Sequence, residues 1–190
     1  MGKGSKMARK ATVTENRILD SAFALMREEG FEQVTARRLA AKAGCSTQPI
    51  FRLYENMDQL IGVVYEQAIA YFERFCEDSP KQNMAPFLDL GMAYIHFAEA
   101  EKNMFRLLFM SGYRGEKSMY ELLNGRSGVI GKEVARARAK GVKKPGEVFM
   151  KMWIFIHGCA CMALTGDFDL TPEETALLLT ESYRACAEAN

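Results

Sequence analysis

Residues 35–60, TARRLAAKAGCSTQPIFRLYENMDQL, carry two short helical patterns on either side of a glycine. Thr35 can cap a first helix that ends at Gly44, and Ser46 can cap a second helix that runs to about Tyr54. Neither helix is long enough to be stable by itself in water. We therefore expect tertiary contacts to hold the pair together, and one of the two helices to be presented for binding.

The residue types of this stretch favour a helix-turn-helix that reads DNA. Small apolar side chains let two helices pack closely across the turn: Leu39, Ala40, Ala43 and Ile50. The second helix then presents hydroxyl and amide groups, which suit base edges in a major groove, from Ser46, Thr47, Gln48 and Pro49. Positive charge for the phosphate backbone flanks them at Arg37, Arg38, Lys42 and Arg52. The alternative is an ordinary helical corner with a solvated polar face.

The surrounding sequence resembles the tetracycline-repressor (TetR) family of transcriptional regulators. Members of that family typically show G-F/Y-x-x-x-T-x-x-x-I-A-x-x-A-G-V-S-x-x-x-L-Y-x-x-F-x-x-K-x-x-L. The matching residues here are Gly30, Phe31, Thr35, Leu39, Ala40, Ala43, Gly44, Cys45, Ser46, Ile50, Phe51, Tyr54, Met57 and Leu60. The resemblance covers roughly residues 12–60. It implies that the helix from Ser46 to about Tyr54 enters the major groove, with Thr35, Phe51 and Tyr54 also at the DNA interface.

Several of these positions depart from the family pattern: Cys45 replaces a usual valine within the core, and three others bear on the contact with DNA. Phe51 stands where the family usually has a tyrosine whose hydroxyl reaches a phosphate, and Met57 stands where a lysine commonly pairs with one. Tyr54 replaces a usual phenylalanine, and its hydroxyl either compensates for the missing contact or lies at the edge of the core. Two lost backbone contacts predict weaker non-specific affinity and a shallower salt dependence than in a typical relative.

Helical spacing of apolar residues recurs along the whole chain, and no stretch alternates with period two for long. We expect an all-α protein of about nine helices and no sheet. Residues 1–11 are expected to form a disordered basic arm, residues 12–56 a helix-turn-helix DNA-binding domain, and residues 57–190 a helical effector-binding and dimerisation domain. The helices of that last domain are expected to begin near Asn56, Phe87, Asn103, Ser118, Pro145 and Thr171.

Charge and cysteine content narrow the partners and the compartment. Residues 1–55 carry 10 Lys/Arg against 6 Asp/Glu, whereas residues 56–190 carry 15 against 18, so only the first part favours a polyanion. The five cysteines form no C-x-x-C pair and the two histidines stand far apart, so we expect no metal and no cofactor. Free thiols in a reducing cytoplasm are the favoured interpretation, and a redox switch at Cys159 and Cys161 is the alternative. The N-terminus lacks the apolar core of a signal peptide, which also favours a cytoplasmic protein.

The segment 147–164, EVFMKMWIFIHGCACMAL, is apolar nearly all round. Its length would suit a membrane span, but Lys151, His157 and Gly158 argue against one, and we expect no membrane association. A helix that is apolar on every side must be buried on every side. We therefore expect the last two helices to pack against the same pair from a second subunit, giving a two-fold homodimer. A monomeric core is the alternative.

The C-terminal part also resembles a subclass of TetR-like regulators that carries a Trp-x-x-x-His-Gly signature, matched here by Trp153, His157 and Gly158. The family resemblance implies a pocket for a small, largely apolar effector among the helices of this part. The side chains expected to line it are Tyr94, Phe97, Phe105, Phe109, Met110, Tyr113, Trp153 and His157. Candidate polar anchors are His96, His157 and Glu99. Ordinary core packing is the favoured interpretation of any one of these residues alone.

The sequence thus predicts a homodimeric DNA-binding regulator, a repressor that leaves a palindromic double-stranded operator when its effector binds. Two other functions were weighed against it. A helical small-molecule carrier or sensor that has lost specific DNA binding would explain Phe51 and Met57. An enzyme that uses His157 with Cys159 or Cys161 is disfavoured, because no acid or second histidine lies at helical spacing to orient His157. We therefore expect no enzymatic activity.

Overall fold

The computed structural model describes residues 13–82, 85–113 and 128–188 of the 190-residue chain. Nine α-helices lie in these ranges, and no strand does, which confirms the all-α prediction. The chain divides into two compact units between Val64 and Tyr65, within a single long helix. The expected basic arm, residues 1–11, lies outside the described residues.

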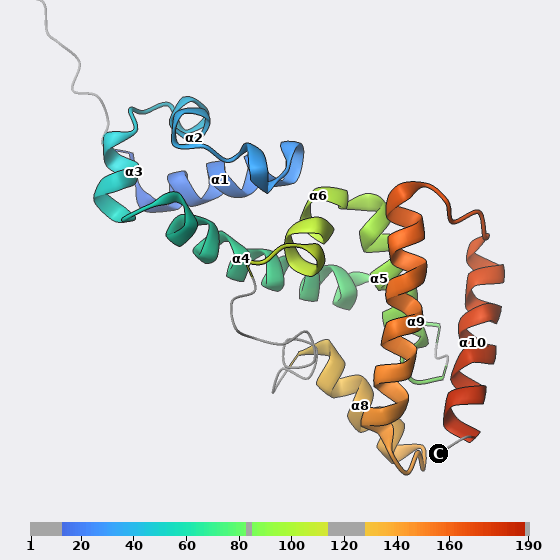
Figure 1. Cartoon of the computed structure of the whole chain (residues 1–190). Coiled ribbons are helices and arrows are strands. Elements are labelled where there is room, and N and C mark those ends of the chain that lie inside the picture. Colours follow the sequence, from blue (N-terminus) through green and yellow to red (C-terminus); the bar gives the residue numbers. More distant parts are fainter. Residues whose placement is uncertain (1–12, 83–84, 114–127, 189–190) are drawn as a thin grey trace, which may run out of the picture. The chain divides into compact units, whose positions relative to one another are not determined.

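The first unit is a small helical module with its own core (Figure 1). Its elements are α1 (Glu15–Glu29), a 3-10 turn (Phe31–Gln33), α2 (Ala36–Ala43), α3 (Gln48–Leu53) and the start of α4 (Met57–Asp78). All four residues expected to lock α2 and α3 together are buried: Leu39, Ala40, Ala43 and Ile50. The fully buried Ile18, Ala22 and Met26 of α1 face the same core. The two short helices are therefore held by packing, as their length requires.

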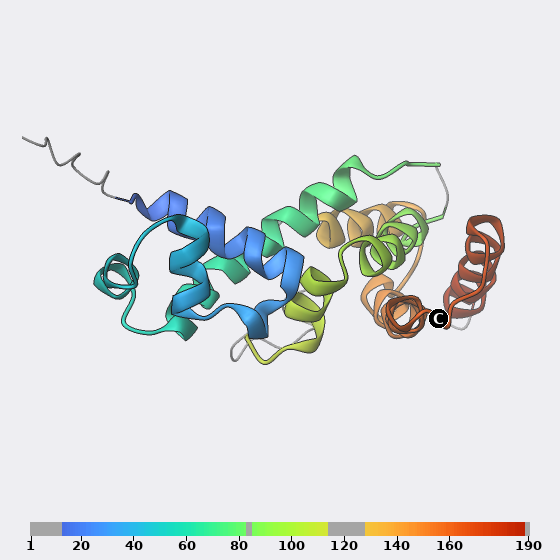
Figure 2. The ribbon, with the colours of Figure 1, turned by 90° about the horizontal axis from the view of Figure 1, so that it is seen from above.

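The second unit is built around α5. Its elements are the rest of α4, α5 (Leu88–Ala100), α6 (Lys102–Phe105), a π-helical turn (Arg106–Met110), α8 (Val129–Ala139), α9 (Pro145–Thr165) and α10 (Pro172–Glu188). Helix α5 contacts α6, α8, α9 and α10. Helices α9 and α10 run side by side in Figure 1 and remain neighbours in the perpendicular view of Figure 2. Of the helix expected from residue 118, the part before residue 128 lies outside the described residues.

Polar caps fix where several of these helices begin. The Thr14 hydroxyl accepts from the Arg17 N–H at 3.3 Å, and the Thr35 hydroxyl accepts from the Arg38 N–H at 3.4 Å. At the start of α10, Thr171 and Glu174 form a reciprocal capping box, with distances of 2.8 and 3.2 Å. These side chains satisfy backbone N–H groups that have no partner inside the helix. The predicted starts of α2 and α10 are thus confirmed.

Among the described residues, α9 is the one helix long and apolar enough to cross a membrane, judged by length and composition alone. Of the most apolar 18-residue stretch of α9, 44% is buried within the protein. Its buried face packs on α5 at close range, because a Cβ at Gly91 would lie 2.8 Å from the Ile156 Cδ1 atom. The apolar composition of α9 therefore serves, in part, to fill the core of the second unit.

Candidate nucleic-acid interface and effector cavity

The turn between α2 and α3 explains why α2 stops at a glycine. Gly44 adopts the left-handed conformation (φ 70°, ψ 35°), which costs a residue with a Cβ free energy that glycine does not lose. Its N–H donates to the Ala41 carbonyl at 3.2 Å, and the Cys45 N–H donates to the Ala40 carbonyl at 2.9 Å. This Schellman arrangement satisfies the last carbonyls of α2 and redirects the chain.

The polar side chains just before and at the start of α3 make no hydrogen bond to the described residues. Ser46 was expected to cap this helix, and that prediction was wrong, because α3 begins at Gln48 and Thr47 holds the N-cap position without a side-chain hydrogen bond. Pro49 has no N–H to offer a cap, and the Ile50 N–H already donates to the Thr47 carbonyl at 3.1 Å. Ser46, Thr47 and Gln48 are all exposed, and their side chains hydrogen-bond to none of the described residues. Their hydroxyl and amide groups are thus available to a partner.

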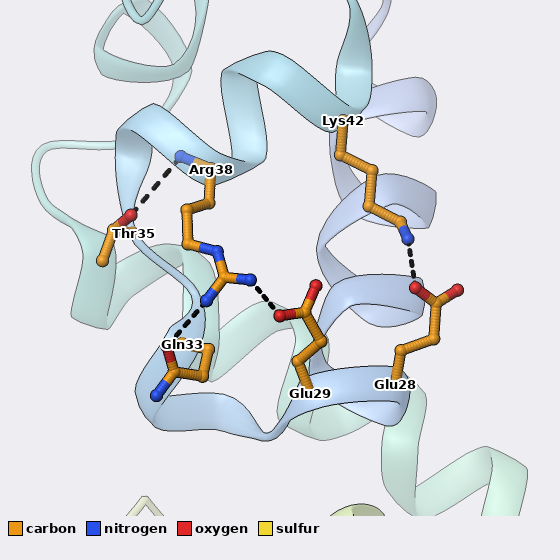
Figure 3. Close-up of polar contacts among 6 residues, drawn as sticks. All are labelled: Glu28, Glu29, Gln33, Thr35, Arg38 and Lys42. Atoms are coloured by element: carbon orange, nitrogen blue, oxygen red, sulfur yellow. Dashed lines mark hydrogen bonds and ion pairs between the residues drawn. The ribbon is translucent and has the colours of Figure 1, made fainter.

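Two of the four predicted phosphate-facing cations are held within the first unit instead (Figure 3). The Arg38 guanidinium forms an ion pair with Glu29 and donates to Gln33 Oε1 at 2.6 Å. The Lys42 ammonium pairs with Glu28 at 2.5 Å. Both ion pairs connect α2 to the end of α1, so these side chains face carboxylates within the first unit.

The other two cations are exposed and make no hydrogen bond or ion pair with the described residues. They are Arg37 on the outer face of α2 and Arg52 near the end of α3. Phe51, next to Arg52, has 51% of its surface exposed, although it is a large apolar side chain. Arg37, Arg52 and the exposed Phe51 ring therefore flank the polar side chains at the start of α3.

Tyr54 is placed at the edge of the core and not on the outer surface. Its side chain is 4% exposed, and its hydroxyl donates to Glu15 Oε1 at 3.0 Å. Burial and the bond to Glu15 raise the pKa of Tyr54 to about 12. The hydroxyl therefore ties the end of α3 to the start of α1, which is the second of the two roles expected for it.

In the second unit, most of the aromatic residues predicted for an effector pocket come together. Tyr94 contacts the rings of Phe105 and Phe109, with centroids 5.3 and 4.8 Å apart. The His157 ring stacks with Trp153 at 5.0 Å and with Phe105 at 5.9 Å. We call this set the aromatic cluster: Phe72, Tyr94, Phe97, Phe105, Phe109, Trp153 and His157.

Phe72, from α4, is the member of the cluster that sequence reasoning missed. Its ring lies 5.0 Å from Phe97, 5.2 Å from Phe109 and 5.9 Å from Tyr94. Tyr71 and Phe75 of α4 are half-buried, and the buried stripe of this helix runs through Tyr65, Ala68, Phe72 and Cys76. The spacing from Tyr65 was the available signal.

Two other predicted pocket residues lie at the margin. Met110 ends the π-helical turn and is 56% exposed, and Tyr113 is half-buried just beyond it. The anchors His96 and Glu99 are exposed and line a separate groove of about 680 Å³ with Asp89 and Glu173. Of the proposed polar anchors, only His157 belongs to the aromatic cluster.

The polar atoms of the cluster are uncharged at neutral pH. The Tyr94 hydroxyl lies 2.9 Å from His157 Nδ1, and Cys161 Sγ lies 3.6 Å from His157 Nε2. Burial lowers the pKa of His157, and it raises the pKa of Tyr94 and of the Cys161 thiol. Imidazole and thiol therefore both stay neutral, which disfavours Cys161 as a nucleophile activated by His157. All five cysteines are free thiols.

A small cavity of about 20 Å³ adjoins the cluster. Its walls are Phe72, Phe87, Leu90, Gly91, Tyr94, Ile130, Phe149, Met152, Trp153 and Ile156. A water molecule needs about 10–15 Å³, so the cavity has room for one atom group and not for a ring. Any aromatic ligand must therefore displace these side chains.

A helix-turn-helix whose polar turn is free for a partner, joined to a helical unit with an aromatic cavity, defines a DNA-binding transcriptional regulator. Residues 87–185 match the family described as "Tetracyclin repressor-like, C-terminal domain", and residues 18–64 match "Bacterial regulatory proteins, tetR family". The chain belongs to the TetR family, which is not a family of enzymes. The Trp-x-x-x-His-Gly subclass stays a prediction.

Individual relatives are distant. The uncharacterized HTH-type regulator YvkB of Bacillus subtilis is 26% identical over 96 residues, which cover 50% of this chain and 51% of YvkB. The chain thus matches about half of that relative's length. Among solved structures, a TetR family protein from Vibrio parahaemolyticus has a TM-score of 0.65 at 15% identity, covering 90% of this chain and 97% of its own. RolR in complex with resorcinol has a TM-score of 0.60 at 14% identity, with 92% and 93% covered. These structures share the fold.

Proposed function

We propose that the protein is a homodimeric, cytoplasmic repressor that binds a palindromic operator through α3 and leaves it when a small, largely apolar molecule enters the aromatic cluster. The observation that carries this proposal is the first turn of α3. The side chains of Ser46, Thr47 and Gln48 are exposed and bond to none of the described residues, while Arg38, Lys42 and Tyr54 connect the surrounding helices. A rigid frame that presents a free polar turn is the arrangement that base recognition requires.

Each group of this turn has a distinct part in the proposed complex. The Gln48 amide can bond to adenine N6 and N7 through two hydrogen bonds, and the hydroxyls of Ser46 and Thr47 can reach bases or phosphates. Arg37 and Arg52 supply phosphate contacts, and Phe51 supplies an apolar surface for a thymine methyl or a sugar. Thr35 caps α2 and orients its N-terminus, whose free N–H groups suit a phosphate.

The homodimer is proposed from the outer face of α9. Its exposed side chains include Ile154 (62%), Phe155 (37%) and Met162 (48%), and Leu177 of α10 is 60% exposed. Such a concentration of exposed large apolar groups on neighbouring helices is typical of a subunit interface. Pairing α9 and α10 with the same helices of a second copy would bury them under two-fold symmetry, which a palindromic operator mirrors.

Release by an effector is proposed from the connection between the cluster and α4. Phe72 brings α4 into the cluster, and the Tyr65 hydroxyl of α4 donates to the Leu108 carbonyl of the π-helical turn at 3.2 Å. The same helix continues into the first unit. A ligand that binds better to a rearranged cluster would shift α4, and with it the spacing of about 34–36 Å that paired reading helices need. That RolR holds resorcinol supports a small aromatic effector.

The first experiment is a salt series of binding to the DNA that flanks the protein's own gene, with the mass of the free protein measured alongside. A repressor of this kind forms dimers, protects one palindromic site, and shows a log-log salt slope of several units. Weak binding that ignores sequence would contradict the proposal and favour a small-molecule carrier instead.

The reading helix itself is tested by Gln48→Ala. Loss of a bidentate base contact costs about 1–3 kcal/mol per half-site, so operator affinity should fall at least tenfold and preference at one base pair should relax. Gln67→Ala, on α4, is the matched control and should leave affinity unchanged. If Gln48→Ala binds the operator with the affinity and sequence preference of the parent protein, α3 does not read the bases through this residue.

A further inference from the structure

One buried polar atom in the second unit is left without a partner. Among the described residues, Trp153 Nε1 is the buried side-chain nitrogen or oxygen that makes no hydrogen bond. The Tyr94 hydroxyl is a nearby polar group: burial raises the pKa of Tyr94, and the indole N–H lowers it by a smaller amount. The indole N–H and the hydroxyl nevertheless do not meet the geometry of a hydrogen bond. Buried donors are nearly always paired in native proteins, because an unpaired one destabilises the fold. This N–H therefore calls for a functional reason.

The surroundings of Trp153 limit what could accept its hydrogen. The residue lines the cavity of about 20 Å³, and the other walls are aliphatic or aromatic apart from the Tyr94 hydroxyl. That hydroxyl lies 2.9 Å from His157 Nδ1 and does not meet hydrogen-bond geometry with the indole N–H. A buried water usually makes two to four hydrogen bonds, and the side chains of these walls offer at most two, from Trp153 and Tyr94. The site thus suits an acceptor atom carried by a larger apolar body.

The cavity also constrains the charge of such a ligand. None of the residues that line the cavity carries a formal charge. An ion brought into this site would lose its hydration without gaining a partner of opposite charge, so a neutral molecule is favoured. An indole N–H only donates, which requires an acceptor on the ligand. The aromatic side chains of Phe72, Phe149 and Trp153 among the walls favour an aromatic ring.

We propose that the cavity beside Trp153 binds an uncharged aromatic molecule whose acceptor atom receives the Trp153 N–H. The inference rests on the proposed function in one respect, that the molecule is the effector, and it adds the chemical class. A ring cannot enter about 20 Å³, so binding must displace the flexible side chains of Met152 and Ile156 or the ring of Phe72. Displacement of Phe72 would act directly on α4.

The test uses the full-length protein without DNA and three bicyclic probes, of which quinoline and naphthalene have the same shape and N-methylquinolinium carries one more methyl group. Quinoline offers a ring nitrogen as acceptor, naphthalene lacks it, and N-methylquinolinium has neither the acceptor nor a neutral charge. Trp153 is the sole tryptophan, so its fluorescence reports binding at this site directly. Quinoline should bind roughly 3- to 10-fold more tightly than naphthalene, the ratio expected for one hydrogen bond, and N-methylquinolinium should not bind. Equal affinities for quinoline and naphthalene, or no binding of either, would overturn the inference.

Removing the N–H alone separates its role from that of the ring. Because the chain has one tryptophan, biosynthetic replacement of tryptophan by benzothienylalanine changes this position only and keeps a bicyclic ring. Measured by calorimetry, the affinity for quinoline should fall to that for naphthalene, which should not change. The thermal stability of the unliganded protein should not decrease, since the N–H has no partner to lose. Retention of the quinoline preference would refute the assignment.

Phe149→Leu is the matched control. Phe149 lines the same cavity but offers no hydrogen-bonding group, so its substitution should change the affinities for quinoline and naphthalene by the same factor. A failure of this inference is distinguishable from a failure of the proposed function. If the operator complex forms but the probes show no preference, only the ligand class is wrong; if the probes discriminate while no operator is bound, only the repressor proposal falls.

Discussion

Arg37 and Arg38 are adjacent and identical in type, but their side chains make different interactions. Arg38 points toward the end of α1 and is bonded to Glu29 and Gln33 (Figure 3). Arg37 is exposed and pairs with none of the described residues. Residue type and local sequence cannot tell them apart, because the difference depends on where the end of α1 lies. The sequence predicted both arginines at the DNA interface. Only the structure shows that Arg38 pairs with a residue of α1 while Arg37 is exposed to solvent.

This contrast predicts different responses to alanine. In a dimer, Arg37→Ala removes two phosphate contacts, and the log-log salt slope of operator binding should fall by about 2, at about 0.9 per contact. Arg38→Ala should change the slope less and should instead lower the free energy of unfolding by up to about 1 kcal/mol, the range for an exposed ion pair. Salt titrations and urea unfolding of both variants measure the two quantities. The same slope change in both would contradict the assigned roles.

Tyr54 gives a prediction that depends on pH. Tyr54→Phe should destabilise the protein by about 0.5–1.5 kcal/mol at neutral pH, because it removes the bond to Glu15. Folding raises the Tyr54 pKa from 10.0 to about 12, so its stabilising contribution is complete below pH 10 and is lost as the pH rises through 12. Urea unfolding of both proteins at neutral pH and between these values checks the sign. The gap between them should narrow with rising pH, and a gap that widens would be inconsistent with the buried hydroxyl.

At the scale of elements, local sequence signals predicted helix starts better than buried faces. Threonine caps and the Thr171–Glu174 box act over three residues, so they are visible in the chain and were confirmed. The π-helical turn at Arg106–Met110 and the inward position of Phe72 on α4 were missed. The spacing from Tyr65 did mark Phe72, whereas the π-helical turn depends on how α4, α5 and α6 meet, and such contacts leave no periodic mark in the sequence.

Two glycines, one in the α2–α3 turn and one within α4, provide a matched pair of substitutions. Gly44→Ala places a Cβ on a left-handed residue, 3.1 Å from the Arg17 Nη2 atom, and should cost about 1–2 kcal/mol of stability. Gly62→Ala, within α4, meets nothing within 4 Å and should stabilise the protein by about 0.5–1 kcal/mol, because alanine favours a helix interior. Urea unfolding followed by circular dichroism compares them. Equal effects of the same sign would show that the turn does not require its backbone conformation.

For the whole molecule, the test of assembly lies on the outer face of α9. Ile154→Glu puts a charge in the proposed dimer interface, and the protein should become monomeric at micromolar concentration while keeping its helical content. Val63→Glu is the control, since Val63 is an exposed apolar residue (39%) on α4 and not on α9 or α10. Sedimentation or light scattering measures the mass. A dimer that survives Ile154→Glu would place the interface on another surface.

The free turn of α3 has an evolutionary consequence. Ser46, Thr47 and Gln48 make no bond that the fold depends on, whereas Arg38, Lys42 and Tyr54 carry bonds that hold the helices together. Mutations at the first three positions should therefore be almost neutral for stability while they change which base pairs are preferred. A duplicated copy of the gene could acquire a new operator by drift at these positions alone, without first passing through an unstable protein.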